Sequence, residues 1–276
     1  MTGRDAIAAA ALVTSGAVLW WRAVQQGDMS LADAAPLLIA FPLAWHLGQP
    51  WSFARQRPCS WITIGAAVAD IALGESLSFP FLSGLGWVLA VAGSGIIHSL
   101  SSIPPRRLLI LPLLGFPWLV GAGGLGWYFR LSAAWISELS FSAAGFDLTR
   151  EGTQLSIQGE PLSVEAACAG LGSLQAMLLA GTAAALLELG RSRRFWLALP
   201  ILAAAAWLGN TLRVLLLSAV TLSSGHSFAS GWFHNVSGWA VLAAIFAACL
   251  ALFRSWASPA HRTTTTVITS HPAPPP

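Results

Sequence analysis

The sequence contains no lysine, a single tyrosine and three cysteines, and only 9% of its 276 residues are charged. All 14 basic residues are arginines, scattered singly and in pairs, without the basic arm or face that a nucleic-acid partner requires. With 55% hydrophobic residues and a mean hydropathy of +0.68, the chain carries more apolar surface than a soluble domain of this length can bury. The composition therefore indicates a protein whose solvent is mostly lipid.

Several motifs are also missing. No spacing of His, Cys, Asp or Glu typical of metal ligands and no phosphate-binding glycine loop occurs, so we expect no cofactor and no metal. The chain shows no internal repeat and no paired, interrupted helices at mid-membrane, which a transporter built from inverted repeats is expected to have.

Apolar stretches recur along the whole chain, each suited to cross the ~30 Å hydrocarbon core as a helix. We predict an all-α membrane protein with about eight transmembrane helices. The first stretch lacks a small-residue cleavage site after it and is interpreted as a retained helix. The predicted spans cover residues 6–24, 31–48, 59–75, 79–100, 106–128, 166–190, 195–222 and 235–253.

The arginines predict the orientation, because short loops rich in basic residues stay in the cytoplasm. With the N-terminus inside, only Arg22, Arg130 and Arg150 fall outside among the loop arginines, and the even number of spans returns the C-terminus to the cytoplasm. We therefore expect a multi-pass protein of the plasma (inner) membrane. The predicted cytoplasmic arginines are Arg4, Arg55, Arg57, Arg106, Arg107, Arg191, Arg193, Arg194, Arg254 and Arg262.

Two segments are not predicted to be membrane spans. Residues 131–165 combine an amphipathic stretch (131–146) with alternating residues at 153–158 flanked by turn residues, which predicts a short β-hairpin on the outer face. Residues 258–276 are rich in Thr and Pro and predict a disordered cytoplasmic tail. Residues 1–257 then form a single polytopic membrane domain.

Cys168 stands where the outer segment enters the sixth predicted span, so its thiol lies near a helix N-terminus, whose dipole favours the reactive thiolate. Gly170 and Gly172 leave room beside it for an incoming backbone. Cys59 and Cys249 map to the cytoplasmic half, which argues against a disulfide. A small buried hydrophobe is the alternative interpretation of Cys168.

Arg213 lies within an apolar run, where a charge is costly and marks a functional hypothesis. Counted from Trp196, it stands about 25 Å along a helix, near the outer surface. Asn210 precedes it by one turn on the same face. An arginine that only reaches towards outer headgroups is the alternative.

His234 begins the eighth predicted span at the same outer depth, where an imidazole can accept the thiol proton. His226, in the preceding loop, is the competing candidate. Three separate segments thus deliver a nucleophile, a cation and a base to one depth of the membrane.

Three blocks in this order, VEAACAGLGSL, NTLRVLLLS and FHNVSGW, resemble the signature blocks of the exosortase/archaeosortase family. The resemblance covers about residues 147–253. It implies a membrane cysteine protease and transpeptidase, with Cys168 as nucleophile, Arg213 as the essential arginine and His234 as the histidine. Ala169, Gly172 and Asn235 depart from the family's usual pattern and bear on the subfamily and its recognition motif.

The resemblance also implies the partners. Family substrates are exported proteins whose C-terminal sorting tail carries a short motif (Pro-Glu-Pro in the bacterial case), a transmembrane helix and a basic end. We expect cleavage on the extracytoplasmic side through a thioester, with an amine or a membrane lipid headgroup as the acceptor of the protein. The alternatives are a transporter, or a non-catalytic subunit of an export or polysaccharide machine.

Overall fold

The computed structural model of the chain describes residues 3–26, 31–52, 60–95, 97–101, 103–116, 123–157, 160–163, 170–225, 228–229 and 231–257. Cys168, His226 and the predicted disordered tail lie outside these ranges.

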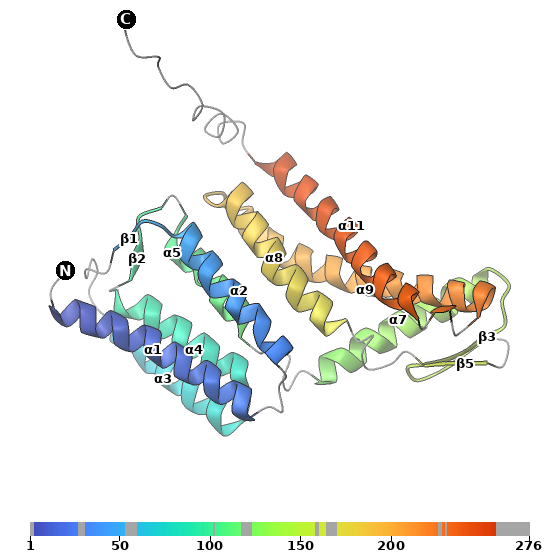
Figure 1. Cartoon of the computed structure of the whole chain (residues 1–276), viewed down its shortest axis with the longest axis horizontal. Helices are drawn as coiled ribbons and strands as arrows, with labels where there is room; N and C mark the ends of the chain where they lie inside the picture. Colours follow the sequence, from blue (N-terminus) through green and yellow to red (C-terminus); the bar gives the residue numbers. More distant parts are fainter. Residues whose placement is uncertain are drawn as a thin grey trace, which may run out of the picture.

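The described residues are mostly helical (Figure 1). The helices are α1 (Gly3–Gln26), α2 (Leu31–Leu47), α3 (Trp61–Ser76), α4 (Pro80–Ser94), α5 (Pro105–Leu108), α6 (Ile110–Gly115), α7 (Gly123–Ala143), α8 (Leu171–Leu189), α9 (Phe195–Ser224) and α11 (Trp232–Trp256). The strands are β1 (Trp51–Ser52), β2 (His98–Ser99), β3 (Leu148–Glu151), β4 (Gln154–Ile157) and β5 (Glu160–Ser163).

Every predicted span except the fourth and the fifth coincides with one helix, and the fourth, 79–100, contains α4 followed by β2. Among the described residues, three helices, α8, α9 and α11, are long and apolar enough to cross a membrane, and 38–47 and 80–94 form shorter apolar helices. The prediction of a helical membrane protein is confirmed in this form. The number of eight crossings stays a prediction.

The fifth predicted span, 106–128, is not one helix. Phe116 ends α6 in an extended conformation, with ψ of 150°, because the residue before a proline avoids the α region and Pro117 follows. The next helix, α7, then runs without interruption through residues predicted as a separate amphipathic stretch. The predicted fifth span is wrong in its boundaries for this reason.

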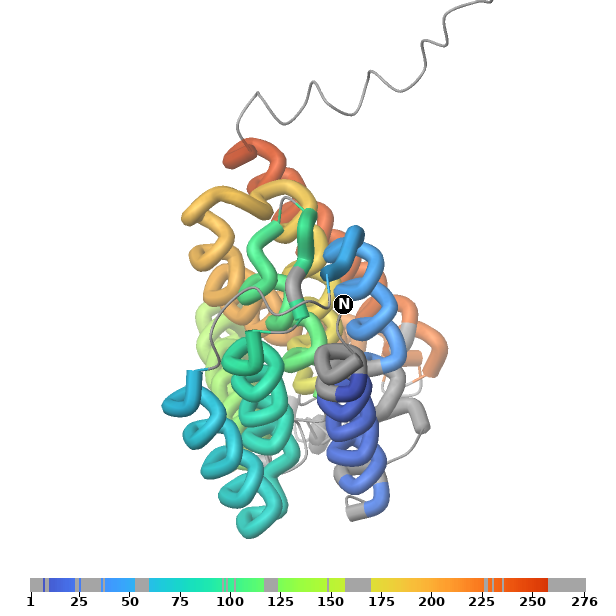
Figure 2. The backbone as a smooth tube through the Cα atoms, turned by 90° about the vertical axis from the view of Figure 1, so that its left-hand side faces the viewer, coloured from blue at the N-terminus to red at the C-terminus, as the bar shows by residue number. Residues whose placement is uncertain are grey.

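In the N-terminal half, α4 packs against both α1 and α3, while α2 packs against α6 (Figures 1 and 2). Close approach depends on small residues. A Cβ atom at Gly86 would lie 2.6 Å from the carbonyl oxygen of Ala67, so α3 and α4 touch backbone to backbone there. Gly95 ends α4 in the left-handed conformation, with φ of 64°, five residues before the predicted span ends at 100.

In the C-terminal half, α8, α9 and α11 pack against one another (Figure 1). Their shared core includes Leu186, Phe195 and Phe253, each at most 1% exposed. Several arginines lie at one end of this three-helix group. The Arg107 side chain donates to the carbonyl of Gly190, Arg194 donates to that of Trp256 at 3.1 Å, and Arg254 pairs with Glu188 at 3.1 Å.

The segment after α7 forms a three-stranded antiparallel sheet in the order β3-β4-β5. Gly152, with φ of 61°, makes the turn between β3 and β4, so the predicted hairpin is present, with a third strand added. Leu155 is 1% exposed and packs with Ala133 and Ala134 of α7 and with Val214 of α9. The sheet is thereby fixed beside the part of α9 that carries Arg213.

Candidate active site

The candidate residues on α8, α9 and α11 gather at the end of the three-helix group opposite its arginines. Arg213 stands 18 residues after Phe195 on α9, about 27 Å along the helix axis. His234 occupies the first turn of α11, and Gly170 precedes the first residue of α8. Three chain segments far apart in sequence therefore meet at one depth.

Arg213 and His234 are in direct contact. The Nη2 atom of Arg213 lies 2.8 Å from Nε2 of His234 and 3.4 Å from the main-chain oxygen of the same residue. A guanidinium has only donors, so Nε2 accepts this hydrogen bond and the imidazole proton is on Nδ1. The contact thus selects one tautomer of a neutral histidine.

Gly238 makes room for this contact. It lies one turn after His234, on the same face of α11. A Cβ atom at position 238 would stand 3.0 Å from both Cζ and Nε of Arg213, closer than ordinary van der Waals contact. Ser237 donates to the main-chain oxygen of His234 at 3.2 Å. The first two turns of α11 therefore hold the histidine and accommodate the arginine.

Asn210 joins α9 to the start of α8. Its side chain is 3% exposed, and neither its Oδ1 nor its Nδ2 atom has a hydrogen-bond partner among the described residues. Gly170 adopts the left-handed conformation, with φ of 74°, and a Cβ atom there would stand 2.5 Å from Cγ of Asn210. The Asn210 amide therefore lies directly against Gly170, two residues after Cys168 in the sequence.

A small crevice joins these groups. Its polar lining consists of Ser173, Asn210 and Arg213, and Gly209 and Gly238 form part of its wall. The cavity of about 10 Å³ has room for roughly one water molecule. The Nε atom of Arg213 is buried and has no hydrogen-bond partner among the described residues. Together with Nδ2 and Oδ1 of Asn210, the crevice therefore offers two donors and one acceptor that those residues do not engage.

The described residues include some of the predicted site residues. The structure brings Arg213, His234 and Asn210 to one place, whereas Cys168 and His226 lie outside the described residues. A Cβ atom at Gly170 would meet the Asn210 side chain, and the expectation that Gly170 leaves room beside Cys168 for an incoming backbone stays a prediction. A Cβ atom at Gly172 meets nothing within 4 Å, so open space remains there.

Gly238 and Ser173 were not recognised from the sequence. The four-residue spacing of His234 and Gly238 was a usable signal, since it places both on one helix face. No comparable signal marked Ser173. Among the described residues, no three His, Cys, Asp or Glu side chains cluster closely enough to hold a metal ion.

The fold and the site define a helical membrane protein with a paired arginine and histidine at one end of its C-terminal helices. Residues 4–252 match the family of transmembrane exosortases, and the chain belongs to this family. The match extends well beyond the resemblance at 147–253 and includes the N-terminal helices. Exosortases are a family of cysteine transpeptidases. No curated protein and no solved structure matches the sequence.

Proposed function

We propose that this protein is a membrane cysteine transpeptidase that cleaves the C-terminal sorting tail of exported proteins. Cys168 is the nucleophile, His234 moves the proton, and Arg213 with Asn210 stabilises the oxyanion. The observation that carries the proposal is the 2.8 Å contact between Arg213 and His234, made beside the segment that follows Cys168.

The sequence keeps Cys168 within reach of this pair. Cys168 precedes Gly170 by two residues, and two residues of chain span at most about 7 Å. Gly170 lies against Asn210, and Asn210 is one helical turn before Arg213 on α9. The family assignment supplies the reason for choosing a cysteine as the nucleophile. Cys249 is buried in α11, in the same core cluster as Phe195 and Phe253, and is therefore not the candidate.

The reaction proceeds in two steps. In the first, the thiol proton passes to His234 and the sulfur attacks the carbonyl carbon of the substrate peptide bond. The tetrahedral intermediate collapses as His234 returns the proton to the leaving amine, which departs with the transmembrane tail. In the second, an amine or a lipid headgroup attacks the thioester and regenerates the thiol.

Arg213 has two successive partners in this mechanism. At rest, its Nη2 donates to Nε2 of His234 and occupies the lone pair that the thiol proton requires. When negative charge develops on the substrate oxygen, the guanidinium donates to that oxygen, and Nε2 becomes available. An arginine stays protonated throughout and stabilises the oxyanion without acting as a base.

We place the reaction on the extracytoplasmic side of the plasma (inner) membrane. The arginine-rich ends of α8, α9 and α11 support this orientation, because basic residues mark the cytoplasmic side and the Arg213–His234 pair is at the other end. The substrates are exported proteins with a short motif, one transmembrane helix and a basic tail, as in the exosortase family.

Co-expression with an exported reporter that bears the sorting tail encoded nearby tests the proposal. We expect processing in the wild type and its loss in Cys168→Ala, with Cys249→Ala as the matched cysteine control. Unchanged processing in Cys168→Ala contradicts the assignment of the nucleophile. Labelling by a membrane-impermeant maleimide, lost in Cys168→Ala, tests that the thiol faces the exterior.

A further inference from the structure

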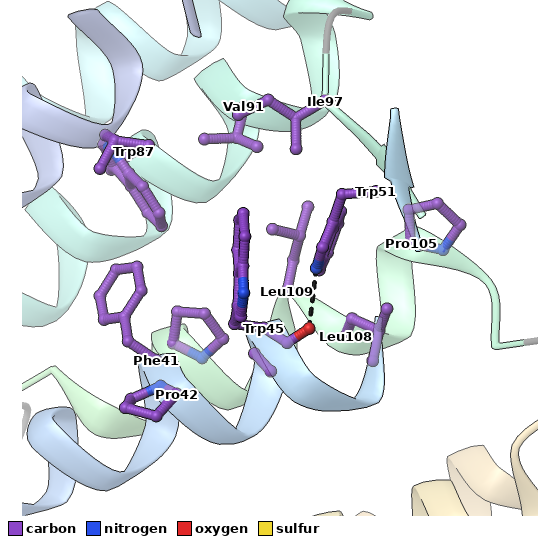
Figure 3. A pocket seen from close by; sticks show the side chains of 13 residues that line it. Phe41, Pro42, Trp45, Trp51, Trp87, Val91, Ile97, Pro105, Leu108 and Leu109 are labelled. Atoms are coloured by element: carbon purple, nitrogen blue, oxygen red, sulfur yellow. Dashed lines mark hydrogen bonds between the residues drawn. The ribbon is translucent and has the colours of Figure 1, made fainter. Parts of the chain in front are cut away.

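A second cavity lies in the N-terminal half, far from the Arg213–His234 pair. Its volume is about 450 Å³, within the size range of small-molecule sites in proteins. Figure 3 shows its lining, which comes from α1, α2, α4, α5, α6 and the segments around β1 and β2. The proposed transpeptidase reaction uses none of these residues.

The lining is entirely apolar in residue type. Two of the three indole N–H groups that border the cavity donate to main-chain carbonyls: Trp51 donates to that of Trp45 at 2.8 Å, and Trp87 donates to that of Leu12 at 2.7 Å (Figure 3 draws the first). A sugar or a peptide backbone would lose its hydrogen bonds on entering, so the lining selects hydrocarbon.

The cavity is partly open at the protein surface. Val13 of α1 and Pro42 and Trp45 of α2 line it and are exposed. Helix α1 packs against α4 and α2 packs against α6 (Figure 2), and residues of all four helices line the cavity. An unfilled space of this kind forfeits van der Waals contacts on all its walls, and acyl chains are the hydrocarbon available beside it.

One end of the cavity lies next to the arginine-rich end of the helices, which the proposed orientation places at the cytoplasmic headgroup level. Pro105, Leu108 and Leu109 line it and flank Arg107, whose side chain is buried against Gly190 at the arginine-rich end. Arg106 is next to Pro105 and exposed. Arginine at this depth attracts anionic lipid, since the phosphate and the guanidinium form charge-assisted hydrogen bonds.

We propose that this cavity binds one acyl chain of an anionic glycerophospholipid, with the lipid phosphate beside Arg106. The site holds α1 and α2 apart at a fixed spacing and makes the packing of the N-terminal helices dependent on lipid. It is separate from the reaction centre, and its occupant is a single chain and not the transmembrane helix of a substrate.

The test uses the full-length protein in phosphatidylethanolamine vesicles that contain phosphatidylglycerol with a photoreactive diazirine in its acyl chain. Trp87 and Val91 are each 4% exposed, so lipid outside the helices does not reach them. We expect labelling at these two residues. Labelling that is confined to exposed residues overturns the proposal. Labelling of Trp87 and Val91 that a transmembrane peptide of the sorting tail displaces also overturns it.

Two exposed valines of α1 provide a matched pair. Val13 lines the cavity and is 53% exposed, whereas Val18 is 51% exposed and is not part of the lining. Val13→Trp should reduce the labelling of Trp87 and Val91 severalfold, and Val18→Trp should leave it unchanged. Equal labelling in the two variants contradicts the site.

Arg106→Gln tests the headgroup assignment. In the wild type, the diazirine probe with a phosphatidylglycerol headgroup should label the cavity more strongly than the same acyl chain on phosphatidylcholine. The substitution should abolish this difference without abolishing labelling. A preference for phosphatidylglycerol that persists in Arg106→Gln shows that the phosphate does not lie beside this arginine.

Discussion

The guanidinium of Arg213 lies against Gly238 so closely that a single methyl group at position 238 would stand 3.0 Å from its Cζ and Nε atoms. The same guanidinium donates to His234, one turn earlier on α11. Two positions on one face of α11 thus contact the guanidinium, and the identity of one glycine is linked to the geometry of the proposed reaction centre.

Gly238→Ala should displace Arg213 and lower the rate of reporter cleavage by about 10- to 100-fold, because small misplacements of catalytic groups carry costs of this order. Gly209→Ala is the matched control. It also faces the crevice, but its Cβ atom would meet Ile245 and Val241 at the ordinary distances of 3.5 and 3.8 Å. Equal cleavage rates in the two variants would show that the position of the guanidinium does not limit the reaction.

The hydrogen bond from Arg213 predicts which nitrogen of His234 carries the proton. Nitrogen NMR of the protein labelled at histidine should show Nδ1 protonated and Nε2 unprotonated in the resting state, with the signal assigned by its loss in His234→Gln. Arg213→Gln should change the Nε2 shift. A resting imidazole protonated on Nε2 contradicts the described contact.

Gly170→Ala should destabilise the start of α8. A non-glycine residue in the left-handed conformation costs about 1–2 kcal/mol, and the added methyl group also collides with Asn210. Gly172→Ala, two residues later and with no neighbour within 4 Å, should be tolerated. Thermal unfolding in detergent compares the two variants, and a similar Tm for both is evidence against the contact between Gly170 and Asn210.

Arg107→Ala should lower the stability of the protein by about 2 kcal/mol, because it removes a buried charged donor from the carbonyl of Gly190 and a cation from the face of Phe195. Arg106→Ala, its exposed neighbour, should change the stability by about 0.5 kcal/mol or less. Denaturation in detergent measures both. Equal losses would mean that the buried hydrogen bond contributes nothing.

Part of this fold could be predicted from the sequence because apolar length and arginine placement depend only on the membrane. From these signals, most helices and the hairpin around Gly152 were predicted, and Arg213 and His234 were predicted to lie at the same depth. The rotation of each helix about its own axis could not be predicted. Helices α8, α9 and α11 are apolar around most of their circumference, so periodicity does not show which face meets a neighbour.

The same limit explains the features that the sequence analysis missed. The contacts of Gly238 with Arg213 and of Gly170 with Asn210 depend on how two helices approach each other. The break of the fifth predicted span was accessible, since Pro117 follows Phe116, but the surrounding apolar run concealed it. The cavity at Trp87 arises from the spacing of helix pairs and has no linear signature.

The central claim is that Cys168, Arg213 and His234 act as one reaction centre, and the covalent intermediate tests it most directly. The protein and the tailed reporter, trapped rapidly with acid, should yield a thioester-linked complex that hydroxylamine releases, with the bond mapped to Cys168 by mass spectrometry. We expect the complex in the wild type and in Cys249→Ala, much less of it in Arg213→Gln and His234→Gln, and none in Cys168→Ala. A hydroxylamine-sensitive complex that persists in Cys168→Ala, or reporter cleavage that continues in that variant, contradicts the account.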